Sequence, residues 1–200
     1  MLSASAAVAG NTRATDERPT ILVMGDSISA AYGIQREEGW VHLLDQRLQA
    51  QGSPWQVVNA SISGETTGGG LARLPQALQA HDPELVIIEL GGNDGLRGYP
   101  ISAIRDNLLA MTELAQAQQR QVLLVGMQIP PNYGPRYTRG FQAMYEEVAA
   151  QTGASVLPFL LQDVALEPGF MQEDGIHPTA PAQPVLLDTL WPYLEPLLTL

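Results

Sequence analysis

Short, continuous apolar runs alternate along this chain with stretches in which apolar residues recur every three or four positions. A short apolar run without polar alternation is typical of a strand that is buried on both faces of a sheet. Five such runs predict five strands, at residues 21–24, 57–58, 85–88, 122–125 and 155–157.

The periodic stretches between these runs predict amphipathic helices. Residues 40–48 place their apolar side chains on one helical face, and Gly52 follows where that helix can end. We expect the next helix to restart at Pro75 and the last one to kink or stop at Pro192, because proline cannot donate a helical hydrogen bond. The further helical segments are at residues 71–78, 104–115, 141–148 and 186–193.

Strands that alternate with helices predict an α/β fold, here a doubly wound three-layer α/β/α domain with a parallel sheet over residues 19–200. We expect residues 1–18 to be a disordered tail or the remnant of a signal peptide, since Ala7-Val8-Ala9 has the small-residue pattern of a cleavage site. The basic start and long apolar core of a leader do not precede it. No run approaches the roughly 20 apolar residues that cross a bilayer, so stable membrane insertion is not expected.

This fold class predicts where a ligand binds. In an open parallel sheet, ligands lie beyond the carboxyl ends of the strands, at the point where the strand order reverses. Ser27 lies just past the first predicted strand, Gly64 past the second and Asn93 past the third. His177, in the segment before the last helix, can fold over the same edge.

Ser27, Asp174 and His177 are the parts of a serine hydrolase. A serine hydroxyl becomes nucleophilic when an imidazole takes its proton and a carboxylate fixes that imidazole. Asp174 and His177 are three residues apart, so Ser27 is the only distant partner required. The alternative is that Ser27 caps a helix and His177 is a solvated turn residue. We expect the other two histidines, His42 and His81, to be packing or surface residues.

Three groups are candidates for an oxyanion hole, which stabilises the negative charge that develops on a carbonyl oxygen during acyl transfer. They are the Asn93 carboxamide and the backbone N–H groups of Gly64 and Ser27. We expect Asp26 and Asp94 to hydrogen-bond the loops that position Ser27 and Asn93. The alternative is that the glycine-rich segment around Asn93 is only a flexible turn.

Composition removes several other functions. The net charge is −11 and all ten basic residues are arginines, which argues against a nucleic-acid partner because such partners are bound through their phosphates. The absence of cysteine excludes disulfides, thiolate metal sites and cysteine nucleophiles. Asp26, Glu89 and Asp94 lack a plausible histidine co-ligand, so no metal is expected. Residues 64–70 only superficially resemble a phosphate loop, since no Gly-Lys-Ser/Thr follows.

Apolar residues follow the third and fourth predicted strands and indicate a substrate groove. Leu96, Ile129 and Tyr133 should border the same sheet edge as Ser27, and the glycines near Leu96 should permit loop movement. We therefore expect a small-molecule ester or thioester with an apolar acyl or aryl group, of medium or long chain.

The serine motif, Gly25-Asp26-Ser27-Ile28-Ser29, lacks the last glycine of the G-x-S-x-G elbow, which disfavours an ordinary α/β-hydrolase. With Gly64, Gly91-Gly92-Asn93-Asp94 and Asp174-Gly175-Ile176-His177, it instead resembles the four sequence blocks of the SGNH (GDSL) hydrolases. The bacterial TAP-like subgroup of this family (thioesterase I/protease I/lysophospholipase L1 and arylesterase) is similar over further segments, at residues 58–64, 70–75, 89–98, 131–134 and 171–172.

By this resemblance, Ser27 is the nucleophile, His177 the general base and Asp174 its orienting partner, while Ser27, Gly64 and Asn93 form the oxyanion hole. The resemblance also implies a flavodoxin-like five-stranded parallel sheet, a monomer and no cofactor. The subgroup accepts aryl and alkyl esters, acyl thioesters and lysophospholipids. It is commonly exported, so a periplasmic or secreted enzyme is expected, with a cytoplasmic one as the alternative.

Two other functions stay open at this point. A carbohydrate O-acetylesterase of the same superfamily would use the same triad with a small acyl pocket. A non-enzymatic flavodoxin-like binding module would need no triad at all.

Overall fold

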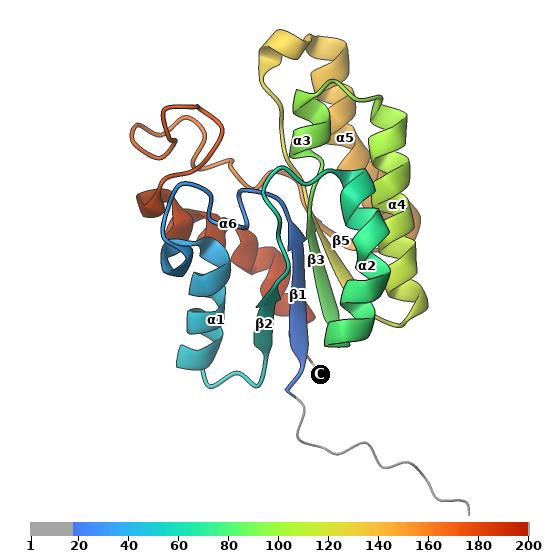
Figure 1. The fold of residues 1–200 in the computed structure, drawn as a ribbon, viewed down its shortest axis with the longest axis vertical. Helices are drawn as coiled ribbons and strands as arrows, with labels where there is room; N and C mark the ends of the chain where they lie inside the picture. The colour runs from blue at the N-terminus through green and yellow to red at the C-terminus, as the bar shows by residue number, and fades with distance from the viewer. Residues whose placement is uncertain (1–17, 200) are drawn as a thin grey trace, which may run out of the picture.

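The computed structural model describes residues 18–199, which form a five-stranded parallel sheet with helices on both faces (Figure 1). The sheet order is β2-β1-β3-β4-β5. The expected tail or signal-peptide remnant at residues 1–18 lies, apart from Arg18, outside the described residues. The strands are β1 (Thr20–Gly25), β2 (Gln56–Asn59), β3 (Leu85–Glu89), β4 (Gln121–Val125) and β5 (Ser155–Leu157).

Burial on both faces of the sheet explains the apolar runs of the two central strands, β1 and β3. Every residue of β1 and β3 is buried, because helices cover both faces of the sheet at this point. Val23 of β1 lies opposite Asn59 of β2 on one side and Ile87 of β3 on the other. The continuous apolar runs therefore do mark strands at the centre of the sheet.

The helices form the two outer layers. In Figure 1, α1 (Trp40–Ala50) and α6 (Gln183–Leu194) cover one face, and α2 (Thr67–His81), α4 (Ile101–Ala117) and α5 (Pro135–Thr152) cover the other. The predicted three-layer α/β/α architecture is confirmed. The described chain also contains short 3-10 helices: η1 (Arg36–Glu38), η2 (Pro131–Tyr133), η3 (Ala180–Ala182) and η4 (Glu195–Leu197).

Prolines interrupt the helices less than expected. Pro75 lies inside α2, which is continuous, so the predicted restart there is wrong. Pro75 is exposed, and water can pair with the carbonyl group that its missing N–H leaves free. Likewise α6 passes through Pro192 and ends at Leu194, two residues later.

A short helix, α3 (Gly92–Leu96), follows β3, and the sequence analysis did not predict it. The chain therefore presents Asn93 from the first turn of a helix. The loops after β1, β2 and β3 meet at one edge of the sheet, because β1 lies between β2 and β3 and all strands run in the same direction.

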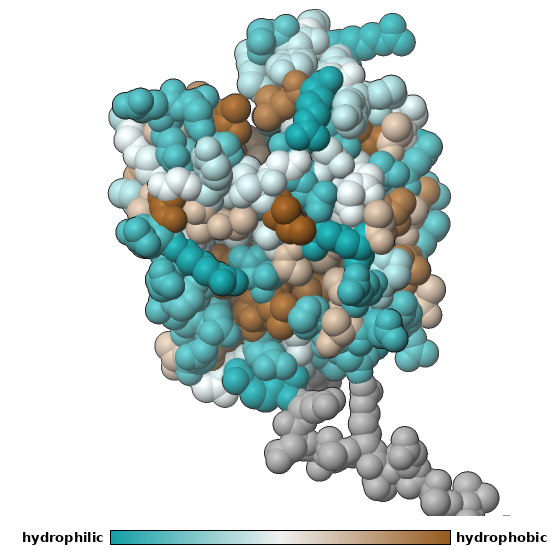
Figure 2. All heavy atoms as spheres, in the orientation of Figure 1, coloured by the Kyte–Doolittle hydropathy of each residue, from teal (hydrophilic) through white to brown (hydrophobic). Residues whose placement is uncertain are grey.

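The surface is hollowed at this edge. Figure 2 shows a notch at the top of the molecule, with apolar atoms on both of its rims. In the same orientation, Figure 1 places the loop that precedes α6 on one side of the notch and α3 with the start of α5 on the other. Among residues 18–199, no helix is long and apolar enough to span a membrane.

Candidate active site

Ser27 occupies the first turn after β1 and is 9% exposed. The Asp26 carboxylate shapes this turn, since its Oδ1 accepts a hydrogen bond from the Ile28 N–H at 3.0 Å. Backbone hydrogen bonds from Ala30 to Asp26 and from Tyr32 to Ser27 complete the turn. The serine hydroxyl is thus held just beyond the end of β1.

A closed loop presents the histidine. Met171 and Pro178 form an antiparallel bridge, and the Gln172 N–H donates to the His177 carbonyl at 2.8 Å. Between them, Gly175 adopts a φ of +65°, a left-handed conformation that glycine accepts without strain. The loop therefore returns on itself and brings its acid and its histidine together.

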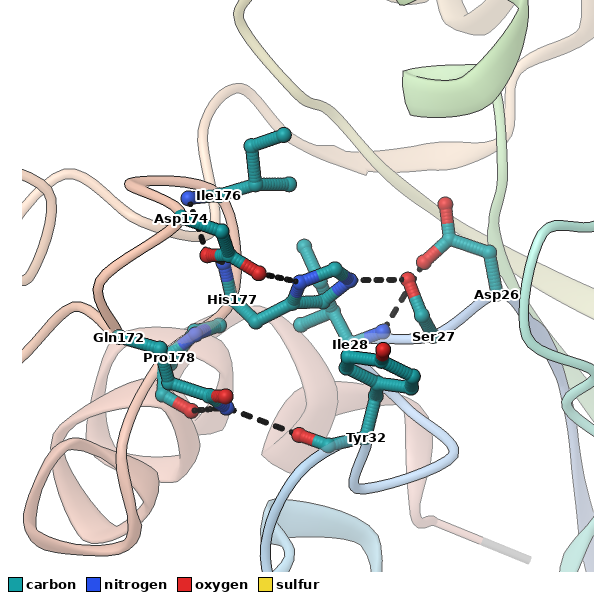
Figure 3. Close-up of polar contacts among 9 residues, drawn as sticks. All are labelled: Asp26, Ser27, Ile28, Tyr32, Gln172, Asp174, Ile176, His177 and Pro178. Atoms are coloured by element: carbon teal, nitrogen blue, oxygen red, sulfur yellow. Dashed lines mark hydrogen bonds and ion pairs between the residues drawn. The ribbon is translucent and has the colours of Figure 1, made fainter.

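The three predicted catalytic side chains form one continuous hydrogen-bonded chain (Figure 3). His177 Nδ1 lies 2.6 Å from Asp174 Oδ2, and His177 Nε2 lies 2.8 Å from Ser27 Oγ. Because Asp174 is an acceptor, the neutral ring carries its proton on Nδ1 and offers the Nε2 lone pair to the serine. Ser27 and His177, which are 150 residues apart in the sequence, are therefore in direct contact.

Asp174 is held as a carboxylate. The hydrogen bond from the His177 ring, helped by backbone N–H groups, lowers its pKa from 3.8 to about 2. Asp174 Oδ1 accepts from the N–H groups of Ile176 and His177, at 2.9 and 3.0 Å. This local turn fixes the carboxylate relative to the imidazole even though its side chain is 39% exposed.

Two residues that sequence reasoning did not assign to the site join the serine turn to the histidine loop. The Gln172 Nε2 group donates to the Tyr32 carbonyl at 2.9 Å and to the Pro178 carbonyl at 3.0 Å. The Tyr32 ring lies 4.5 Å from the His177 ring, centroid to centroid, and both appear in Figure 3. The only sequence signal for Gln172 was its place in the motif before Asp174.

The loops that carry the predicted oxyanion donors contact one another. Asn93 Nδ2 donates to Asp26 Oδ2 at 3.0 Å, which leaves its second N–H for another acceptor. Gly64 adopts a φ of +80°, and Arg97 Nη2 donates to its carbonyl oxygen at 3.2 Å. Within residues 18–199, the backbone N–H groups of Ser27 and Gly64 donate to no backbone carbonyl group.

The expectation that Asp26 and Asp94 position the loops is confirmed. Asp26 contacts both the serine turn and Asn93, as described above. Asp94 accepts from the Thr67 N–H at 2.9 Å and from the Thr67 hydroxyl at 2.7 Å, which ties α3 to the start of α2. His42 and His81 lie away from this site: the first is half-buried and bonds Gln46, and the second is exposed.

The three expected substrate residues lie beside one another but differ in exposure. The Tyr133 hydroxyl donates to the Leu96 carbonyl at 2.7 Å, and both side chains are half-buried. Ile129 is 7% exposed and packs under Gly95, where an added Cβ would lie 2.7 Å from it. Gly95 therefore serves close packing rather than the loop movement that the sequence suggested.

Comparisons with known proteins agree with this geometry. The sequence pattern of the GDSL-like Lipase/Acylhydrolase family matches residues 23–183. Esterase TesA of Pseudomonas aeruginosa is 54% identical, over 90% of this chain and 89% of that protein. The Arylesterase of Vibrio mimicus is 46% identical over 82% of each chain. Thioesterase 1/protease 1/lysophospholipase L1 of Escherichia coli K12 is 43% identical, over 89% of this chain and 84% of that protein.

Solved structures show the same fold. The crystal structure of TesA superposes with a TM-score of 0.87 at 54% identity and covers 89% of this chain and 99% of that one. The psychrotrophic esterase EstA from Pseudoalteromonas sp., inhibited by monoethylphosphonate, gives a TM-score of 0.85 at 44% identity, over 88% and 97% of the two chains.

Proposed function

Because this chain belongs to the GDSL-like lipase/acylhydrolase family, the SGNH hydrolases, we propose that Ser27 is the nucleophile with which it cleaves its substrates. The chain is a carboxylic ester hydrolase that acts on esters and thioesters, so the non-enzymatic binding module is set aside. One observation carries the assignment of the nucleophile: the hydrogen-bonded chain from Ser27 through His177 to Asp174.

Acylation uses this chain of contacts directly. His177 Nε2 accepts the proton of Ser27 Oγ as the oxygen attacks the carbonyl carbon of the ester or thioester. Asp174 stabilises the imidazolium that forms. The imidazolium then protonates the leaving alkoxide or thiolate as the bond to the acyl carbon breaks, which leaves an acyl-enzyme on Ser27.

Deacylation repeats the same steps with water. His177 takes a proton from a water molecule, the hydroxide attacks the acyl carbon, and Ser27 leaves with the proton that the imidazolium returns. In both steps the carbonyl oxygen becomes negative and is stabilised by the Ser27 and Gly64 N–H groups and by the Asn93 amide. Loss of one such donor typically lowers kcat by about 10²- to 10³-fold.

The Ser27→Ala variant tests the nucleophile. We expect turnover to be lost while the variant still binds a non-hydrolysable substrate analogue, because the acyl-enzyme cannot form. Ser29→Ala, two residues on, is the specificity control for labelling. An organophosphate should modify the wild-type protein and Ser29→Ala, but not Ser27→Ala. A Ser27→Ala variant with near-native activity would remove Ser27 from the mechanism.

We further propose that Leu96, Ile129 and Tyr133 define the acyl side of the site, with Ile129 supporting the other two from below. The half-buried Leu96 and Tyr133 supply apolar surface beside the oxyanion donors, and the notch in Figure 2 has apolar rims. Each methylene group that becomes buried contributes about 0.8 kcal/mol. A groove of this kind favours medium or long acyl chains, such as those of lysophospholipids and acyl thioesters.

A series of esters and matched thioesters, from acetyl to long acyl chains, tests this groove. We expect kcat/KM to rise by roughly fourfold per added methylene until the groove is filled. Leu96→Ala should reduce kcat/KM for long chains and leave the acetyl ester nearly unchanged. A maximum at the acetyl ester would instead favour a carbohydrate O-acetylesterase, and the alanine variant would then have no chain-length effect.

For the setting of the enzyme, we propose a monomer that is exported to the periplasm or secreted. The small-residue pattern Ala7-Val8-Ala9 supports export, as does the family resemblance. Fractionation of cells that express the chain from its natural gene, with sedimentation of the purified protein, tests both points. Activity confined to the cytoplasmic fraction, or a dimer at micromolar concentration, would contradict them.

A further inference from the structure

A second carboxyl group lies beneath the serine turn and takes no part in the proton transfers described above. Glu89, the last residue of β3, is fully buried. Its Oε2 accepts from the Ser29 hydroxyl at 2.7 Å and from the Asp26 N–H at 3.3 Å. Its Oε1 is buried and finds no donor among residues 18–199.

The neighbour of Glu89 is another acid. Glu89 is bonded to the backbone N–H of Asp26, and the Asp26 side chain is itself only 3% exposed. Two adjacent carboxylates cannot both stay ionised in a buried site, because each disfavours the charge of the other. One proton shared between them turns the repulsion into a hydrogen bond.

The surrounding contacts decide which acid keeps the proton. Each oxygen of the Asp26 carboxylate has a donor: the Ile28 N–H bonds Oδ1 and the Asn93 amide bonds Oδ2. For Glu89, the donors reach only Oε2. Hydrogen bonds therefore stabilise a negative charge on both oxygens of Asp26 but on only one oxygen of Glu89. Oε1 of Glu89 is the oxygen that needs a proton.

We propose that Glu89 is held as a neutral carboxylic acid that donates from Oε1 to the Asp26 carboxylate, and that Asp26 in turn orients the Asn93 amide for the oxyanion hole. Both are positioning residues, since neither touches the reacting atoms. The inference rests on the proposed function only in taking Asn93 as an oxyanion donor.

The charges around the pair are consistent with a single negative charge. Burial raises the pKa of Glu89 well above its usual value, and the charge of Asp26 adds to this. Burial also raises the pKa of Asp26, to about 6, against the opposing hydrogen bonds and the His177 ring. Tyr145 and Asp94 face the same region, and the pKa of Tyr145 is raised by its burial and by these acids.

This arrangement has a mechanical consequence for Asn93. An asparagine amide can rotate to exchange its oxygen and nitrogen, and only one orientation offers N–H groups to a substrate. An anionic acceptor at Asp26 selects the orientation with Nδ2 inward, which the structure has. If Asp26 lost its charge or its position, the amide could turn and present its oxygen to the oxyanion.

Isosteric variants separate a neutral Glu89 from an ionised one. In Glu89→Gln, the amide group reproduces a protonated acid: it donates to Asp26 and accepts from Ser29. We expect Glu89→Gln to keep kcat within about threefold, and Glu89→Ala and Asp26→Asn to lose about 10- to 100-fold in kcat with KM within twofold. Glu84→Ala is the matched control at the other end of β3, where Glu84 accepts from the Thr20 N–H, and it should leave kcat unchanged.

A double-mutant cycle tests whether the pair acts through Asn93. In an Asn93→Ala background, Asp26→Asn should cost less than about threefold in kcat, because its target is already gone. The full loss in that background, or a Glu89→Gln enzyme as impaired as Glu89→Ala, would overturn the proposal. If Glu89→Ala does not fold, Glu89→Gln and the Asp26 cycle still decide.

Organophosphate labelling of Ser27 in every variant separates this question from the identity of the nucleophile. Failure of Ser27→Ala to lose activity would refute the proposed nucleophile, whereas failure of the cycle refutes only the positioning role. An infrared band of a protonated carboxylic acid should be present in the wild-type protein and absent from Glu89→Gln. Its persistence in Glu89→Gln would place the proton elsewhere.

Discussion

At the scale of single residues, the chemistry depends on which nitrogen of one imidazole carries a proton. Asp174 determines this, because its carboxylate accepts from Nδ1 and is itself anchored by two backbone N–H groups. With a pKa of about 2, Asp174 remains ionised throughout the range in which an imidazole can act as a base. A half-exposed acid can therefore serve as well as a buried one.

Replacement of Asp174 by asparagine should retain the shape of the turn and lose its effect on the ring. The asparagine amide can donate to Nδ1, which favours the tautomer with the proton on Nε2, and that tautomer cannot accept a proton from Ser27. We expect kcat to fall by roughly 10²- to 10⁴-fold, measured with an aryl ester. Glu173→Gln, which removes the adjacent exposed charge, is the control and should retain wild-type kcat.

The predicted residues that the structure brings into contact have a chemistry that is visible in isolation. An Asp and a His three residues apart, with a serine at the end of a strand, indicate a triad before any contact is known. Gln172, Tyr32 and Glu89 could not be assigned in this way. The role of Gln172 depends on its hydrogen bond to the Tyr32 carbonyl, and Tyr32 is 140 residues away in the sequence.

At the scale of secondary-structure elements, the junction between β3 and α3 positions Asn93, the side-chain donor of the proposed oxyanion hole. Gly91 makes the turn with a φ of +118°, and its missing side chain leaves room for the Tyr145 hydroxyl. That hydroxyl donates to the Leu90 carbonyl at 2.9 Å, so α5 holds the end of β3. The packing of this junction therefore determines the position of Asn93.

Gly91→Ala tests how tightly this junction is packed. The new Cβ would lie 2.5 Å from the Tyr145 hydroxyl and on a residue with a strained φ, so we expect a loss of roughly 3 kcal/mol in the free energy of unfolding and a lower kcat. Gly98→Ala is the matched control: it also has a positive φ, +69°, but open space around it. It should cost about 1 kcal/mol and leave kcat intact, as denaturant unfolding and initial rates will show.

Element boundaries were predictable where burial alone sets them and not where a partner does. The strand predicted at residues 85–88 is observed at Leu85–Glu89, since continuous apolar residues need a buried place in the sheet. The α2 helix was expected to restart at Pro75, but packing of Leu74 and Leu78 in the core keeps it continuous. α3 is too short to show a periodicity, so no sequence pattern could reveal it.

At the scale of the whole molecule, Asp174 and Asp26 change the stability of the fold in opposite directions as the pH rises. The folded pKa of Asp174 is below its usual 3.8, so its contribution is present above about pH 4 and is lost as the pH falls toward 2. The folded pKa of Asp26 is above 3.8, at about 6, so the folded state binds the extra proton between these values. The contribution of Asp26 therefore falls as the pH rises from about 4 to 6.

Chemical denaturation of wild type and Asp26→Asn at several pH values measures how much stability is lost as Asp26 ionises. Relative to the variant, the wild-type protein should lose roughly 2 to 3 kcal/mol of unfolding free energy between pH 4 and pH 7. Glu173→Gln should run parallel to the wild type over the same range. A constant difference between wild type and Asp26→Asn would show that Asp26 titrates at its usual value.

The strand order has one more implication, for how such an enzyme can change. The proposed site residues Ser27, Gly64 and Asn93 follow β1, β2 and β3, and Asp174 and His177 lie beyond β5. The segment that follows β4 therefore supplies none of these five residues. Residues 130–134, which are exposed or half-buried, can thus accumulate substitutions that change the substrate preference of the enzyme without disabling it. Directed evolution confined to that stretch should yield many active clones with altered selectivity, a freedom that the turn carrying Ser27 does not offer.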